Sequence, residues 1–194
     1  MEEAKRMEYA KVIAEATRKF ADLITNILKL NKLENQQIHP SRATYDLSEQ
    51  LTQSLLQYED VWERKKIAID AEIEDGITVY ADAELLSLVW NNLLSNAFKF
   101  TEADGTVSVK LKAEETYAYV EVTDTGCGMT KEVGEHIFEK FYQGDLSHSS
   151  QGNGLGLALV KRVIDITGCD ISVRSEKGKG TSFMVKVPRR TKDG

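Results

Sequence analysis

The chain has 194 residues, of which 41% are hydrophobic and 29% charged, and this suits one folded domain with a smaller appended element. These proportions exclude a collagenous or wholly disordered chain, and no run approaches the roughly 18 consecutive apolar residues of a membrane crossing. With 25 basic and 31 acidic residues, the chain is too acidic for a broad nucleic-acid surface. We therefore expect a cytoplasmic chain without a nucleic-acid partner and without membrane contact.

Residues 1–37 contain no glycine or proline and predict one long helix. Ile13, Phe20 and Ile27 recur every seven residues along it. A second line of the same stripe consists of Ala16, Leu23 and Leu30. A helix packed against its own domain remains open, but a heptad pattern sustained over three repeats favours self-association into a homodimer.

The polar connection at residues 37–45 marks a domain boundary, so we assign residues 1–37 to a dimerisation helix and residues 38–194 to a second domain. The second domain mixes helical and strand patterns. Expected elements, in chain order, are a helix at 48–64, strands at 66–73 and 77–81 around Asp75-Gly76, a helix at 82–100, a hairpin of strands at 106–115 and 116–124, a helix at 155–166, and strands at 171–176 and 181–188.

The helix expected at residues 82–100 carries a polar stripe. Asn92, Asn96 and Lys99 are spaced i, i+4 and i+7, so they share one face while apolar residues fill the rest. Asparagine is a mediocre helix former, an amide oxygen suits Mg²⁺, and a lysine can meet phosphate oxygens. Taken alone, the stripe is better explained as a solvated face.

Two glycine-containing motifs follow. DTGCGM at 124–129 comes after a predicted strand, where an aspartate can accept a hydrogen bond from an exocyclic amine and glycines let the backbone approach a flat ring. GNGLGL at 152–157 lies at a loop-to-helix junction, where backbone amides and the helix N-terminus favour an anion. In isolation, an ordinary loop explains the first motif equally well.

Two further segments complete the set. IFEKFYQ at 137–143 places apolar residues in a polar region, so it anchors a mobile lid or simply packs into the core. GKGT at 178–181 closes the back of a pocket or, more simply, forms a hairpin turn.

The motifs in this order resemble the catalytic ATP-binding domain of sensor histidine kinases, within the Bergerat-type superfamily that includes type II topoisomerases, heat-shock chaperones and mismatch-repair ATPases. The resemblance covers about residues 41–190, and residues 1–37 look like the second helix of the dimerisation hairpin. It implies an α+β fold, a two-layer sandwich with a mixed sheet, preceded by a long N-terminal helix. It also implies ATP and Mg²⁺ as cofactors and the receiver domain of a response regulator as a partner.

Carried over by position, the resemblance implies that Asn96 is the Mg²⁺ ligand, that Asn92 assists it, and that Lys99 contacts phosphate. These three residues form the implied catalytic set. The implied nucleotide-binding residues are Asp124 for the adenine, Gly126, Gly128, Tyr142, Gly152, Gly154, Leu155, Gly156 and Thr181.

Asn92 distinguishes between the classes of this superfamily. Hydrolytic members and related serine kinases carry a glutamate at this position, four residues before the metal asparagine, because water or a hydroxyl must lose a proton. An amide cannot act as that base at neutral pH, whereas neutral imidazole is already nucleophilic. Asn92 therefore favours transfer of phosphate to a histidine.

None of the three histidines, His39, His136 and His148, lies in the family's acceptor pattern. We expect a fragment whose acceptor histidine precedes residue 1, and which binds Mg-ATP without phosphorylating itself. Gln143 is a second departure, because many relatives carry an arginine there near the γ-phosphate. Two alternatives stay open: an ATPase or serine kinase of the same fold, and a dimerisation scaffold without catalysis.

Overall fold

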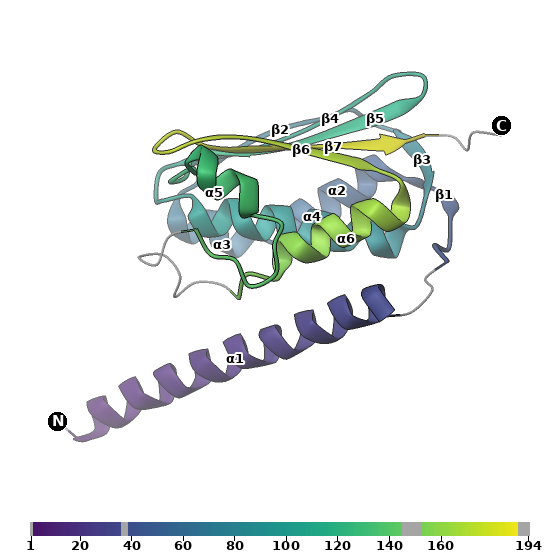
Figure 1. Cartoon of the computed structure of the whole chain (residues 1–194). Helices are drawn as coiled ribbons and strands as arrows, with labels where there is room; N and C mark the ends of the chain where they lie inside the picture. Colours follow the sequence, from purple (N-terminus) through teal and green to yellow (C-terminus); the bar gives the residue numbers. More distant parts are fainter. Residues whose placement is uncertain (1, 36–38, 145–152, 190–194) are drawn as a thin grey trace.

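The structure is a computed structural model that describes residues 2–35, 39–144 and 153–189. A five-stranded sheet forms one layer, and α2, α4 and α6 lie on one of its faces, as Figure 1 shows. The mixed two-layer α+β fold is therefore confirmed. The helices are α1 (Glu2–Asn35), α2 (Leu47–Leu56), α3 (Glu59–Lys65), α4 (Ala83–Phe100), α5 (Lys131–His136) and α6 (Gly156–Thr167). The strands are β1 (Ala43–Asp46), β2 (Ala68–Ile73), β3 (Thr78–Ala81), β4 (Thr106–Ala113), β5 (Tyr117–Asp124), β6 (Asp170–Glu176) and β7 (Gly180–Pro188).

The strand order of the main sheet is β2-β4-β5-β7-β6. β2 runs parallel to β4, and the other neighbours are antiparallel, which confirms the predicted hairpin of β4 and β5. Residues alternate along β5: Ala118, Val120 and Val122 are buried against the helix layer, and the residues between them are half-buried. This alternation fixes the register, so Asp124, the next residue on the buried side, also faces the helices.

The two strands on either side of Asp75-Gly76 do not pair with each other. β2 joins the main sheet, whereas β3 pairs with β1 in a separate antiparallel ribbon. The reason is Ser48, whose hydroxyl donates to the Glu74 carbonyl at 2.6 Å and accepts from the Ile77 N–H at 3.0 Å. Ser48 lies in the first turn of α2, and its hydroxyl links the two sides of the Asp75-Gly76 turn, so that β2 and β3 separate there.

The single helix expected at 48–64 is wrong, because the chain breaks it into α2 and α3 at Gln57 and Tyr58. The Tyr58 hydroxyl donates to the Asn91 carbonyl at 3.0 Å, and its ring stacks on Phe98 with centroids 5.0 Å apart. These contacts hold Tyr58 against α4. The chain therefore turns there instead of continuing the helix.

Both ends of α4 are fixed by side chains. Asp82 caps the N-terminus, where its carboxylate accepts from the Leu85 N–H at 3.0 Å. At the C-terminus the Lys65 ammonium donates to the carbonyls of Phe98 at 2.7 Å and Thr101 at 2.9 Å. A cation at the negative end of the helix also complements its dipole. The polar stripe of α4 is thus carried by a helix that is held at both ends.

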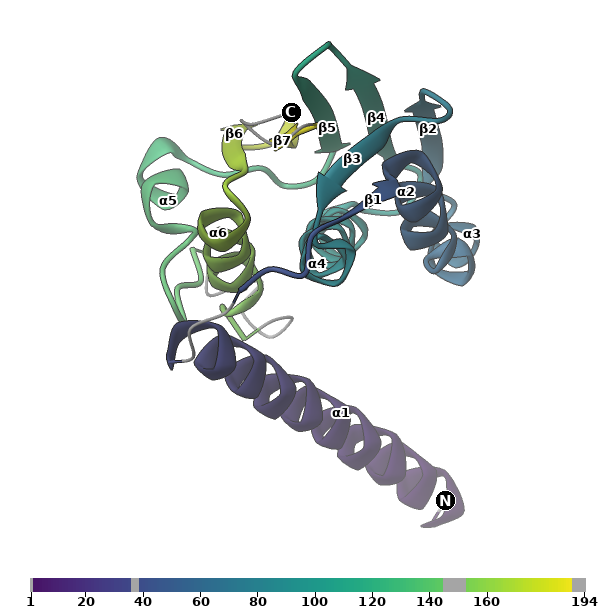
Figure 2. The same cartoon turned by 90° about the vertical axis from the view of Figure 1, so that its right-hand side faces the viewer.

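α1 extends away from the α/β domain, and among the residues that the structure describes it touches that domain with its last turns, as Figures 1 and 2 show. Leu30 and Leu33 are buried there, and Arg162 of α6 donates from Nε to the Leu33 carbonyl at 2.9 Å. Farther out, Ile13 is 66% exposed and Phe20 is 62% exposed. Packing on its own domain therefore accounts for the end of the helix, including Leu30 of the heptad stripe, and leaves the part of the stripe around Ile13 and Phe20 uncovered in a single chain.

None of the helices within the described ranges is both long enough and apolar enough to cross a membrane.

Candidate functional site

Asp124 occupies the last position of β5 and is 7% exposed. Its carboxylate accepts a hydrogen bond from the Gly126 N–H at 2.8 Å, and the backbone N–H of Thr181 also stabilises it. Burial raises the pKa of Asp124 to about 6, against the opposing effect of these two hydrogen bonds. At neutral pH Asp124 is therefore a buried, mostly ionised acceptor with limited contact to water.

The loop after Asp124 is pressed against the turn between β6 and β7. The Gly178 N–H donates to the Cys127 carbonyl at 2.7 Å. A Cβ on Gly128 would lie 2.0 Å from the Glu176 carbonyl oxygen, and a Cβ on Gly180 would lie 1.9 Å from the Asp124 carbonyl oxygen. Gly180 also has a φ of +109°, which L side chains rarely adopt. Because these glycines have no side chain, the two segments can pack directly against each other and form one wall of the site.

Thr181 is both the end of the GKGT turn and part of this wall. It pairs with Asp124 on one side and with Ser175 of β6 on the other, so the three residues form one row across the sheet. Thr181 is 8% exposed. The sequence motifs did not single out Ser175, because the register that brings it beside Thr181 depends on how β6 and β7 pair.

The polar stripe of α4 lies next to the start of α6. Asn92 donates from Nδ2 to the Leu88 carbonyl at 2.7 Å, and its Oδ1 lies 2.7 Å from where a Cβ on Gly156 would be. Gly156 thus lets α6 approach Asn92. Asn96 is half-buried, and its side-chain amide makes no hydrogen bond to any residue that the structure describes. Lys99 lies over the Phe100 ring at 4.3 Å, and burial lowers its pKa.

α6 begins without a capping side chain or an acidic residue in its first turn. Leu155 is the N-cap residue and is 1% exposed, and its N–H donates to Asn153 Oδ1 at 3.1 Å. The N–H groups of the first turn therefore have no side-chain acceptor among the described residues. Gly152, the first glycine expected at this hinge, lies outside the described residues, as does His148.

Tyr142 lies between α5 and the glycine hinge. Its ring centroid is 5.4 Å from that of His136, which contacts Glu139 at 2.7 Å, and this carboxylate raises the pKa of His136. The neighbouring Phe141 N–H donates to the Gly154 carbonyl at 2.9 Å. The aromatic segment is thereby attached to the hinge, as expected of a lid anchor, although Phe141 itself is 61% exposed rather than buried in the core.

The predicted residues therefore fall into two linked groups. Asp124, Gly126, Gly128 and Thr181 form a closed end, while the stripe of α4 and the start of α6 form the other end. A Cβ on Gly126 would lie 2.5 Å from the Phe100 carbonyl oxygen, so the first group meets the C-terminal end of α4 directly.

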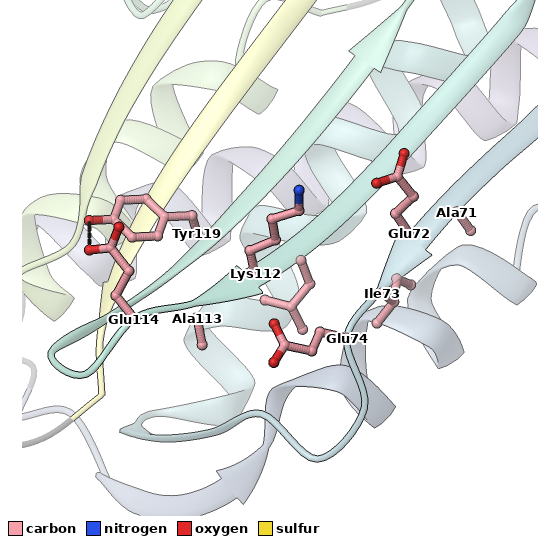
Figure 3. Close-up of a pocket in the computed structure, with 9 residues that line it drawn as sticks. Ala71, Glu72, Ile73, Glu74, Lys112, Ala113, Glu114 and Tyr119 are labelled. Atoms are coloured by element: carbon pink, nitrogen blue, oxygen red, sulfur yellow. Dashed lines mark hydrogen bonds between the residues drawn. The ribbon is translucent and has the colours of Figure 1, made fainter.

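Among the described residues, two hollows near the sheet bear on where the site lies. One of about 800 Å³ is at the edge where β2 ends beside the β4-β5 hairpin, where Tyr119 donates to Glu114 (Figure 3), and no predicted site residue lines it. The other, of about 330 Å³, includes Asp124, Ser175 and Thr181 in its lining. Thr123, Arg174 and Ser182 also line it, and these residues alternate to the face of the sheet that is turned away from the helices. This hollow therefore reaches the closed end from the outer face of the sheet and is not the space between Asp124 and α4.

Comparison with known protein families identifies the class of protein to which this chain belongs. The model described as histidine kinase-, DNA gyrase B-, and HSP90-like ATPase matches residues 81–191. The chain belongs to this family, and it is homologous to the catalytic domains of sensor histidine kinases.

The individual relatives that the chain resembles are also histidine kinases. The circadian input-output histidine kinase CikA of Synechococcus elongatus is 34% identical over 192 residues, which are 96% of this chain and 26% of CikA. Sensor histidine kinase YclK of Bacillus subtilis is 29% identical over 197 residues, which are 98% of this chain and 41% of YclK. The chain thus spans between a quarter and two fifths of the length of these relatives.

Solved structures extend the likeness to the fold. Full-length ShkA in complex with AMPPNP has a TM-score of 0.80 at 29% identity, over 96% of this chain and 39% of that chain. Histidine kinase ThkA in complex with the response regulator protein TrrA has a TM-score of 0.77 at 20% identity, over 94% of this chain and 51% of that chain.

Proposed function

We propose that this chain is the ATP-binding catalytic part of a sensor histidine kinase, which transfers the γ-phosphoryl group of Mg-ATP to a histidine on a helix outside this chain. The observation that carries the proposal is the buried Asp124 carboxylate, held by the backbone of Gly126 and Thr181 at the end of β5.

In this proposal, Asp124 recognises the adenine base by a hydrogen bond. An ionised carboxylate can only accept hydrogen bonds, and the exocyclic amine of adenine is a donor. Two backbone N–H groups already hold the carboxylate in place, so it presents its remaining lone pairs in a fixed direction. The absence of a side chain at Gly126 lets its backbone lie against the Phe100 carbonyl, where a Cβ would be 2.5 Å from the oxygen, and so keeps the Gly126 N–H in place beside the carboxylate.

Asn96 and Lys99 face the phosphates. The Asn96 amide is half-buried and has no hydrogen-bond partner among the described residues, so its oxygen is free to act as a hard ligand of the kind that Mg²⁺ prefers. When bound, Mg²⁺ supplies charge neutralisation at the phosphates. Lys99 adds a partly desolvated cation, and the uncapped first turn of α6 with Gly154, Leu155 and Gly156 offers backbone N–H groups.

Asn92 supports a histidine as the acceptor. Its Nδ2 donates a hydrogen bond to the Leu88 carbonyl, and an amide takes up no proton at neutral pH. A water or serine nucleophile would need such a base at this position. A neutral imidazole needs mainly positioning and charge neutralisation, which the remaining groups provide.

The acceptor itself is proposed to lie outside this chain. His39 is exposed, and His136 is paired with Glu139 at the surface, in contact with the lid segment. We also propose that α1 forms a homodimer through the uncovered stripe around Ile13 and Phe20. A receiver domain of a response regulator is the proposed downstream partner, in line with the complex of ThkA and TrrA.

Radiolabelled ATP tests the reaction. The chain alone, with Mg²⁺ and γ-labelled ATP, should bind nucleotide and gain no acid-labile phosphate. The natural protein that contains this sequence should gain acid-labile phosphate on histidine and lose it in the Asp124→Ala variant. Acid-stable label on serine, steady release of phosphate, or label on this chain alone would contradict the proposal.

A further inference from the structure

Ser175 lies in β6, outside every motif discussed above, and its hydroxyl connects three segments of the closed end of the site. It accepts a hydrogen bond from the Met129 N–H at 2.8 Å and donates to the Gly180 carbonyl at 2.9 Å. Its Oγ also lies 2.9 Å from Thr181 Oγ1. Ser175 therefore joins the loop after Asp124 to the start of β7.

The position of one proton follows from these contacts. A serine hydroxyl has a single hydrogen, and a carbonyl can only accept, so the hydrogen of Ser175 is used by Gly180. The contact with Thr181 is then a hydrogen bond in which Thr181 donates and Ser175 accepts. Burial favours this arrangement, because it leaves neither the Gly180 carbonyl nor the Thr181 hydrogen without a partner.

The direction of this hydrogen bond limits the hydrogen bonds that Thr181 can make to a ligand. Once its only hydrogen points at Ser175, the Thr181 oxygen can accept hydrogen bonds and cannot donate one. Thr181 is the direct neighbour of Asp124 across the β5-β7 pair, and Asp124 is likewise an acceptor when ionised. The two adjacent side chains therefore present acceptors only.

We propose that Ser175 is a positioning residue that fixes the hydrogen-bonding direction of Thr181 and thereby makes the site select a purine with an amine at position 6 over one with a carbonyl. This inference rests on the proposed function, since it takes the purine to lie against Asp124. Without the Ser175 hydroxyl, the hydrogen of Thr181 is free to rotate and donate to a purine carbonyl.

Ser175 also supports the loop after Asp124 through Met129, and this second role has a different signature. Loss of that support weakens the binding of every purine nucleotide equally. The direction of the Thr181 hydrogen bond instead changes the ratio between two nucleotides. Selectivity therefore separates the positioning role from a merely structural one.

The test is calorimetric titration with ATP and with inosine triphosphate, whose base carries a carbonyl in place of the amine. Valine and threonine have the same shape, so Ser175→Val and Ser175→Thr form a matched pair that differs in the hydroxyl. The ratio of the two affinities should fall about three- to tenfold in Ser175→Val and stay near the original in Ser175→Thr. Ser172→Val, on the exposed face of the same strand, should leave the ratio unchanged.

Thr181→Val provides a second route if Ser175→Val does not fold. It should lower the same ratio, and adding Ser175→Val to it should lower the ratio no further, because Ser175 acts on selectivity through Thr181. An unchanged ratio in Ser175→Val, or a fall in Ser175→Thr as large as in Ser175→Val, would overturn the inference. Failure of the unmodified chain to bind ATP would instead overturn the proposed function.

Discussion

The two ends of the site differ in how completely the protein has built them. At the closed end, Asp124, Thr181 and Ser175 are joined by hydrogen bonds to each other's segments, and Gly128 and Gly180 leave no space for a side chain. At the other end, the Asn96 side chain has no hydrogen-bond partner among the described residues, and the first turn of α6 has no capping side chain.

This difference indicates that the two ends have different roles in nucleotide binding. The closed end is pre-organised, so binding a purine there costs little ordering of the protein. The open end presents an amide, a cation and backbone N–H groups, which gain partners when phosphates and Mg²⁺ arrive. We therefore expect damage to the closed end to remove all nucleotide binding, and damage to the open end to affect the phosphates only.

The largest effect should come from Gly180→Ala. The added Cβ would lie 1.9 Å from the Asp124 carbonyl oxygen at a φ of +109°, so the wall of the closed end must move. We expect a loss of about 3 kcal/mol or more in the free energy of unfolding, measured by urea denaturation, and loss of ATP binding.

Gly178→Ala in the same turn is the matched control. Gly178 also has a positive φ, of +81°, but a Cβ there meets nothing within 4 Å. We expect it to cost about 1 kcal/mol and to leave ATP binding intact. Equal effects of the two substitutions would show that the close packing at Gly180 is not what shapes the closed end.

Asp124→Asn should come next in size. The asparagine carbonyl can face either the backbone N–H of Gly126 or the purine amine, so a donor faces a donor in both orientations. The affinity for ATP should fall about 100-fold, which corresponds to about 3 kcal/mol. The exposed Asp165→Asn, which removes an ion pair with Lys161, should leave the affinity unchanged.

Acid should weaken binding by a smaller, graded amount. Burial raises the pKa of Asp124 from 3.8 to about 6, so the carboxyl becomes protonated below about pH 6 and loses its role as an ionised acceptor. The affinity for ATP should then fall up to about tenfold for each pH unit below 6.

The stability of the fold should respond to Asp124 in the opposite direction. A raised carboxyl pKa means that the folded state holds the proton more tightly than the unfolded chain does. The contribution of this group to stability therefore decreases as the pH rises from about 4 to 6. Calorimetry and denaturation at a series of pH values check both trends, and a flat affinity between pH 5 and 7 would contradict the role given to Asp124.

Asn96→Ala should have the smallest and most selective effect. Removing the amide should lower the affinity for Mg-ATP about five- to tenfold and leave the affinity for adenosine unchanged, because adenosine has no phosphates. Ser87→Ala, which removes a hydroxyl that bonds the Glu84 carbonyl on the same helix, should change neither. A loss of adenosine binding in Asn96→Ala would remove the distinction between the two ends.

The sequence predicted those parts of the fold and site that depend on local patterns. The alternation in residues 106–124 predicted the β4-β5 hairpin, and the apolar periodic run at residues 82–100 predicted α4. The i, i+4 and i+7 spacing placed Asn92, Asn96 and Lys99 on one helix. The metal and nucleotide roles of these residues stay predictions.

What the sequence did not predict depends on contacts between distant segments. Ser48 separates β2 from β3 through a turn about 26 residues away, and Tyr58 breaks a helix by bonding to α4. Lys65 caps α4 from 33 residues earlier in the chain. Ser175 meets Thr181 only through strand register. Local periodicity carries no information on such contacts, because they are set when the elements pack.

A crystal structure of the chain with Mg²⁺ and AMPPNP would test the central claim most directly. We predict that the purine amine lies about 3 Å from the Asp124 carboxylate, with residues 126–129 unmoved and the phosphates between Asn96 and the start of α6. A purine bound away from Asp124, or a closed end filled by side chains when nucleotide is present, would contradict the account.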